Sequence, residues 1–245
     1  MRRTRQAFDE QLAELERRLL EMGEFVETML EKAGRALTTH DVKLAEEAIA
    51  SDDTADDMDL EIEQRCMRLL ALQQPMSRDL RTIGTVMKVI ADVERIGDYS
   101  VDIARTAIEL ARTEYYKPLE DIPDMVEIVR WMLRRALEAL VTHDLALVAK
   151  VIERDDEVDG LWYRIREQVE GVMQERAEVV PQAVALLLVA RYLERVADHT
   201  VNIAERVAYM ETGRLEALAP SHRTEAERET RDEGCPDTGA GAEGG

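Results

Sequence analysis

The chain of 245 residues contains an internal repeat of about one hundred residues. Residues 39–41 (Thr-His-Asp) return as residues 142–144, and residues 94–98 (Glu-Arg-Ile-Gly-Asp) return as residues 194–198 (Glu-Arg-Val-Ala-Asp). The offset is 103 residues for the first pair and 100 residues for the second. Solenoid repeats are much shorter, about 20–50 residues each, so the sequence predicts a duplicated domain.

The composition predicts that both copies are helical. Only 12 Gly and 6 Pro interrupt long stretches rich in Ala, Leu, Glu, Arg and Met, which are strong helix formers, and the apolar residues recur with helical spacing. We expect six helices, at about residues 5–38, 42–72, 78–115, 123–141, 144–175 and 179–211. Three helices per copy, joined by short loops, predict an all-α fold of two tandem three-helix bundles.

The boundaries of the elements follow from caps and prolines. Asp41 and Asp144 are expected to be N-caps that begin the second helix of each copy after a turn at His40 or His143, and Ser77 is expected to cap the third helix. A proline-bearing segment near residue 118 separates the copies. We therefore expect a first bundle over residues 1–117, a second over residues 118–212, and a disordered tail over residues 213–245.

Charge and cysteine content restrict the function classes. The net charge is −20, from 52 acidic and 32 basic residues, which argues against nucleic acid as a partner and is compatible with cations or basic protein surfaces. The two cysteines, Cys66 and Cys235, form no Cys-x-x-Cys pair, which favours a reducing, cytoplasmic setting. No apolar run reaches the roughly 18 residues of a membrane span, so we expect no membrane insertion.

Acidic residues line one border of the buried face of each third helix. Glu94, Asp98 and Asp102 follow one another at intervals of four residues, and the second copy has Glu194, Asp198 and Asn202 at the equivalent positions. A carboxylate beside a buried face requires a compensating partner, because desolvating an unpaired charge is costly. That partner is either a metal ion or a neighbouring arginine, such as Arg95 or Arg195.

The second helix of each copy carries further aspartates, which are expected to approach these rows because the second and third helices of a bundle are in contact. Oxygen-only donor sets suit hard cations such as iron, manganese, magnesium or calcium. The ions that we expect on these carboxylates are iron, manganese, magnesium or zinc. The candidate metal ligands are Glu94, Asp98, Asp102, Glu194, Asp198, Asn202, Asp53, Asp56, Asp156 and Asp159.

The duplicated Glu-x-x-x-Asp rows, together with residues 75–81 (Pro-Met-Ser-Arg-Asp-Leu-Arg) at the start of the third helix, resemble the PhoU family of phosphate-transport accessory regulators over residues 5–212. The resemblance implies a cytoplasmic, non-enzymatic adaptor between the ATPase subunit of a phosphate ABC transporter and a sensor histidine kinase. Such an adaptor represses the phosphate-starvation response when phosphate is plentiful. The resemblance also implies metal clusters on the rows, with Glu94, Asp98, Glu194 and Asp198 as ligands before Asp102 and Asn202. We further expect a homodimer.

Two other function classes are weighed against this one. A carboxylate-bridged di-iron enzyme uses Glu-x-x-His pairs on two helices, and no acidic residue lies three positions before any of the four histidines. We therefore expect no enzymatic activity. A structural helical scaffold, in which the acidic rows bind metal or only pair with arginines, stays open on the residues alone.

Overall fold

A computed structural model describes residues 2–73, 75–214 and 216–219 of the chain. Within these residues the protein is helical and contains no strand, which confirms the all-α prediction. The elements are α1 (Arg2–Thr39), α2 (Val42–Ala50), α3 (Asp52–Gln73), α4 (Ser77–Leu110), α5 (Asp121–Thr142), α6 (Leu145–Glu175), the short 3₁₀ helix η1 (Ala177–Val179) and α7 (Val180–Thr212).

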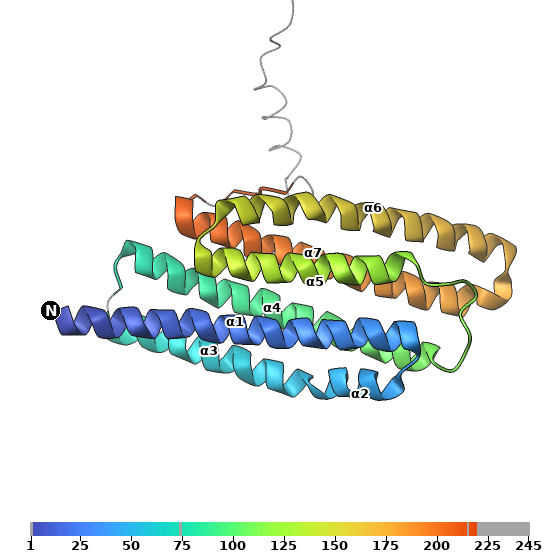
Figure 1. The fold of residues 1–245 in the computed structure, drawn as a ribbon, viewed down its shortest axis with the longest axis horizontal. Helices are drawn as coiled ribbons and strands as arrows, with labels where there is room; N and C mark the ends of the chain where they lie inside the picture. The colour runs from blue at the N-terminus through green and yellow to red at the C-terminus, as the bar shows by residue number, and fades with distance from the viewer. Residues whose placement is uncertain (1, 74, 215, 220–245) are drawn as a thin grey trace, which may run out of the picture.

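The helices form two bundles that lie side by side with their long axes in a common direction (Figure 1). The first bundle consists of α1, α2, α3 and α4, and the second of α5, α6 and α7. The bundles meet where α1 packs against α5 and α4 against α7, and their buried apolar side chains form one continuous cluster. The segment 111–120 links α4 to α5 and contains the predicted boundary at residues 117 and 118, which stays a prediction.

The turn after the first helix of each bundle is built in the same way in both copies. His40 (φ 55°) and His143 (φ 56°) adopt the left-handed conformation that ends a helix. The carboxylate of Asp41 accepts a hydrogen bond from the backbone N–H of Leu44, and that of Asp144 accepts from the backbone N–H groups of residues 146 and 147. Both predicted aspartate caps are therefore confirmed.

Two local predictions about helix boundaries are wrong. The predicted helix over 42–72 is divided at Ser51, whose backbone N–H donates to the carbonyl of Ala48 three residues back (3.2 Å), so that α2 ends in a tighter turn. The second copy has Arg154 at this position and a continuous α6. Ser77 is not an N-cap. Met76 takes the extended cap conformation (φ −77°, ψ 165°) and makes no side-chain capping bond, so Ser77 is the first residue inside α4.

The described part of the C-terminal segment contacts the second bundle. The carboxylate of Glu205 accepts hydrogen bonds from the backbone N–H groups of Leu218 (2.6 Å) and Ala219 (3.3 Å), and the Ala219 side chain is buried. Residue 215 and residues 220–245, which include Cys235 and most of the predicted tail, lie outside the described residues. None of the helices in the described part of the chain has an apolar stretch long enough to cross a membrane.

Candidate acidic faces

Each bundle carries an acidic face along the contact between its last two long helices. In the first bundle these are α3 and α4, and in the second α6 and α7. Glu94 and Glu194 occupy equivalent positions at the border of the core. The Glu94 side chain is 29% exposed and that of Glu194 only 12%. The predicted placement of the rows beside the buried faces is therefore confirmed.

Arginines pair with the two rows in matching geometry. Arg95 Nη1 lies 2.9 Å from Asp98 Oδ2, and Arg195 Nη1 lies 2.9 Å from Asp198 Oδ2. The Nε atom of each arginine lies 3.7 Å from the carboxylate of the preceding glutamate. The second face has an additional cation, because Arg191 Nη1 contacts Glu194 Oε1 at 2.5 Å. Local ion pairs thus neutralise part of each row.

The acids of α3 approach the row on α4. Burial raises the pKa of Glu94, and the charges of Asp98, Asp56 and Asp59 raise it further, while Arg95 opposes them. The pKa of Asp52 is raised by burial and by the charges of neighbouring acids on both helices. Folding therefore brings carboxylates of α3 and α4 close together on the first face, where their negative charges repel one another.

The second face shows the same effect with more compensation. Burial raises the pKa of Glu194, followed by the charge of Asp198 and then, more weakly, Asp159, whereas Arg191 and Arg195 lower it. Glu194 Oε2 is buried and accepts no hydrogen bond from the described residues. This oxygen is the acceptor on the second face with spare capacity for a further donor or a cation.

The structure does not bring all the predicted ligands together. Asp53, Asp56 and Asp156 are exposed to solvent, although the charge of Asp56 still acts on Glu94. Asp102 Oδ1 lies 3.5 Å from Arg105, and the Asn202 amide donates to Asp92 across the contact between α4 and α7 (3.3 Å).

The predicted ligands leave out two acids of the first face, Asp52 and Asp59. Both lie with Asp56 at helical spacing along α3, and the charge of each acts on another acid of this face. The signal that could have found them is the interval of four and then three residues, which places all three side chains on one side of the helix.

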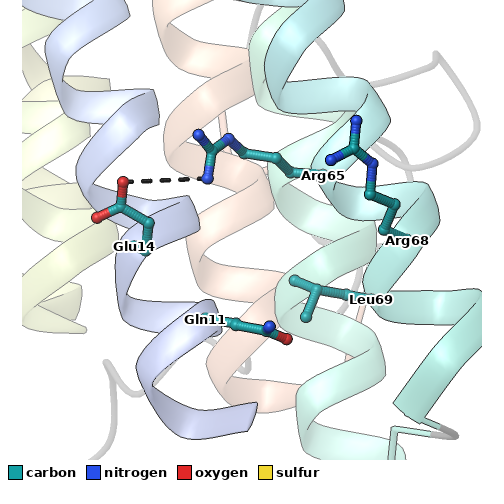
Figure 2. Close-up of a pocket in the computed structure, with 5 residues that line it drawn as sticks. All are labelled: Gln11, Glu14, Arg65, Arg68 and Leu69. Carbon is teal, nitrogen blue, oxygen red and sulfur yellow. Dashed lines mark ion pairs between the residues drawn. The ribbon is translucent and has the colours of Figure 1, made fainter. Parts of the chain in front are cut away.

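A separate pocket of about 170 Å³ lies between α1 and α3, and none of the ten predicted ligands lines it. Figure 2 shows Arg65 reaching from α3 towards Glu14 on α1, with the two side chains 4.0 Å apart, while Arg68, Leu69 and Gln11 complete the wall. Arg65 also pairs with Glu61 at 2.6 Å. Its charge is therefore shared by two carboxylates.

A known protein family matches the chain over the same two bundles. The family model for the PhoU domain matches the chain twice, over residues 19–107 and residues 122–207. The chain belongs to the PhoU family. The starts of the two PhoU domains are 103 residues apart and their ends 100 residues apart, in agreement with the offsets of the internal repeat.

Relatives of the PhoU family cover most of the chain. A "phosphate-specific transport system accessory protein PhoU homolog" of Clostridium acetobutylicum is 38% identical over 212 residues, which is 86% of this chain and 97% of the relative. The homologue from Aquifex aeolicus is 38% identical over 205 residues, 84% of this chain and 93% of the relative.

Two solved structures of PhoU proteins have the same fold. The crystal structure of the phosphate transport system regulatory protein PhoU from Streptococcus pneumoniae superposes with a TM-score of 0.81 at 33% identity, covering 86% of this chain and 100% of the other. PhoU from Pseudomonas aeruginosa superposes with a TM-score of 0.82 at 32% identity, covering 84% and 100%.

The acidic faces of the two PhoU domains fit a metal ion in donor chemistry. Their donors are carboxylate oxygens, folding raises the pKa of Glu94 and Glu194, and Glu194 Oε2 accepts no hydrogen bond from the described residues. Within residues 2–73, 75–214 and 216–219, however, no three acidic, histidine or cysteine side chains converge closely enough to hold an ion. A cation would therefore require Asp98 and Asp198 to exchange their arginine partners for the ion.

Proposed function

We propose that the chain regulates phosphate uptake and signalling as an adaptor that catalyses no reaction. The observation that carries the proposal is the match of both bundles to the PhoU domain, together with relatives named as accessory proteins of phosphate-specific transport that align over 93% or more of their own length. Likeness over both domains supports a shared role better than likeness over one domain alone.

The partners that we propose are the ATPase subunit of a phosphate ABC transporter and a phosphate-sensing histidine kinase, which the chain contacts in the cytoplasm as a homodimer. The net charge of −20 supports docking on basic protein surfaces and disfavours nucleic acid. By linking transporter and kinase, the chain represses the phosphate-starvation response when phosphate is plentiful.

Deleting the gene for this chain should leave phosphate-starvation genes expressed in phosphate-rich medium, because the kinase no longer receives the transporter's state. A reporter fused to a phosphate-uptake gene measures the effect, and the full chain supplied from a plasmid should restore repression. The tagged chain should also retain the transporter ATPase in a pull-down. Normal repression in the deleted strain would remove the adaptor proposal.

We also propose that each acidic face binds a multivalent cation, which would relieve the repulsion among its carboxylates. Glu94 and Asp98 would hold it on the first face, with Asp56 from α3, and Glu194 and Asp198 on the second, with Asp159 from α6. What supports the proposal is the raised pKa of Glu94 and of Glu194, each caused in part by other carboxylates of the same face. Iron, manganese, magnesium and zinc are the ions to test.

Replacing Glu194 with Gln should stabilise the metal-free protein at pH 7. The pKa of Glu194 is higher in the folded than in the unfolded chain, so ionisation at pH 7 disfavours folding, and Gln removes that charge. As the pH falls through the raised pKa, the folded wild-type protein takes up the proton first and gains stability. The difference between the proteins should therefore vanish near pH 4, as measured by thermal melting.

The same variants test the cation. Added Mn²⁺ should raise the melting temperature of the wild-type chain by several degrees, at about 2–4 °C per kcal/mol, and should not raise that of the double variant Glu94→Gln/Glu194→Gln. Glu153→Gln, an exposed acid elsewhere on α6, is the matched control and should respond as the wild type does. Unchanged melting of the wild type with all four ions, and no metal by elemental analysis, would count against the cation proposal.

A further inference from the structure

The contact between the two bundles, here called the junction, consists of the packing of α1 on α5 and of α4 on α7. It has an approximate two-fold symmetry, because equivalent residues of the repeat exchange partners. A Cβ atom added to Gly23 would lie 2.0 Å from Leu137 Cδ1, and one added to Gly34 would lie 2.8 Å from Val126 Cγ1. The repeat aligns Gly23 with Val126 and Gly34 with Leu137. The first bundle therefore supplies both hollows of the junction, and the second both projections.

Charges in the junction are divided between the bundles in the same way. Arg130 of α5 is only 11% exposed, with Nε 2.6 Å from Glu27 Oε1 and Nη2 2.7 Å from Glu31 Oε2, both on α1. Arg134 Nη2 lies 2.8 Å from Glu27 Oε1. The repeat aligns Glu27 with Arg130 and Glu31 with Arg134. At these equivalent positions α1 is acidic and α5 is basic.

The second half of the junction is also built from residues that differ between the copies. Asp92 Oδ1 of α4 lies 2.9 Å from His199 Nδ1 and accepts a hydrogen bond from the amide of Asn202 (3.3 Å), both on α7. Tyr99 stacks on Tyr192, with 5.9 Å between ring centroids. At an offset of 100 residues, Asp92 corresponds to Tyr192 and Tyr99 to His199. In a symmetric dimer of identical bundles the two equivalent contacts would contain the same residues. Here one contact is an aspartate with a histidine and the other is a pair of tyrosines.

The buried core of α1 and α5 differs less between the copies than the junction does. Several buried core positions, which alternate along the helix with the junction positions, have the same residue in α1 and α5. These equivalent pairs are Met22/Met125, Val26/Val129, Met29/Met132, Leu30/Leu133 and Ala33/Ala136. In α1 and α5 the shared core positions therefore stay the same, while the junction positions Gly23, Glu27, Glu31 and Gly34 differ from their equivalents in size or charge.

Pairing of like bundles in this geometry would lose each of these contacts. Two first bundles would place Glu27 and Glu31 against their own copies without a cation, and would leave the hollows at Gly23 and Gly34 unfilled. Two second bundles would place arginine against arginine and drive Leu137 into a side chain where the present contact leaves room only for glycine.

We propose that the junction is a self-excluding interface, which accepts a bundle of the opposite type and rejects a second copy of the same bundle. The partner that fits each face is the other half of this sequence, from the same chain or by reciprocal exchange with a second chain. Self-association of whole chains must then use another surface or exchange complete halves. This inference does not depend on the proposed function.

The test cuts the full chain in the linker after folding. A recognition sequence for a specific protease, inserted between Lys117 and Pro118, yields two fragments; the cut protein is unfolded in guanidinium, refolded, and weighed by native mass spectrometry. Pairs of unlike fragments should exceed all pairs of like fragments by about tenfold or more. The uncut chain, refolded in parallel and monitored by circular dichroism, is the control.

Charge variants distinguish specific pairing of unlike bundles from non-specific association of the fragments. Arg130→Glu should lower the ratio of unlike to like pairs at least about tenfold. Exchanging all four junction charges (Glu27→Arg, Glu31→Arg, Arg130→Glu, Arg134→Glu) should restore the ratio. Three outcomes would overturn the inference: a statistical mixture with as many like as unlike pairs, helical fragments that stay apart, or cut protein that fails to refold where the uncut chain succeeds.

Discussion

Replacing Arg130 with Met should lower the free energy of unfolding by about 3–5 kcal/mol, because it leaves charged Glu27 in the junction without its closest cation. Glu27 is 14% exposed and pairs with Arg130 at 2.6 Å, so water cannot fully replace the guanidinium. Arg134 still reaches Glu27 at 2.8 Å, but it is 57% exposed and compensates only in part. Urea denaturation followed by circular dichroism measures the change.

Two further variants determine whether burial of the charge causes this loss. Arg17→Met removes an arginine that also contacts two glutamates but is 54% exposed, and should cost less than about 1 kcal/mol. Adding Glu27→Leu to Arg130→Met removes the stranded charge and should recover most of the stability. A loss for Arg130→Met no larger than that for Arg17→Met would show that the junction charges are solvated.

Much of the fold could be predicted because its signals are local. Helix formers, apolar periodicity and aspartate caps lie within a few residues of the elements that they specify, and the repeat presents each signal twice. The turns at His40 and His143 are an example, since the Thr-His-Asp sequence alone indicates a helix end followed by a cap. The break at Ser51 was missed because it interrupts the helical periodicity at a single residue and no Gly or Pro marks it.

The candidate site could be predicted only in part. The repeat identified Glu94 and Glu194 as equivalent acids, and the helical period placed them at the border of the core. Periodicity shows which face of a helix is buried but not which neighbour covers it. For that reason no role could be assigned from the sequence to His199, whose partner Asp92 lies 107 positions earlier and on another helix. Asn202, expected beside the second row, turns to the same aspartate.

The glycines of α1 illustrate the same limit. Within the sequence, Gly23 and Gly34 are residues that weaken a helix, and nothing nearby explains them. The reason for these glycines is more than 90 residues away in the sequence. The side chains of Val126 and Leu137 occupy the space that a side chain at either glycine would need. Once the packing is known, the repeat itself contains the signal, because each glycine aligns with the side chain that the other glycine accommodates.

Replacing Gly23 with Ala should therefore destabilise the protein by about 1–3 kcal/mol, although alanine is the better helix former by about 1 kcal/mol. The added methyl group would lie 2.0 Å from Leu137 Cδ1 and 3.3 Å from its Cγ, so the Cδ1 methyl group must move away and the rest of the side chain must shift slightly within a packed contact. Gly84→Ala is the matched control. Gly84 lies in the helical interior of α4 with nothing within 4 Å of an added Cβ, and its replacement should stabilise the chain by about 0.5–1 kcal/mol.

The double variant Gly23→Ala/Leu137→Ala tests whether the added methyl group and the Leu137 side chain compete for the same space. Leu137→Ala alone should cost about 2–5 kcal/mol, because Leu137 is buried and leaves a cavity in the junction. In the pair, the new methyl group enters that cavity and no longer meets the leucine, so the double variant should be more stable than the sum of the single losses by about 1–3 kcal/mol. Additive losses would mean that Leu137 finds another position at no cost and that the hollow at Gly23 does not specify the junction.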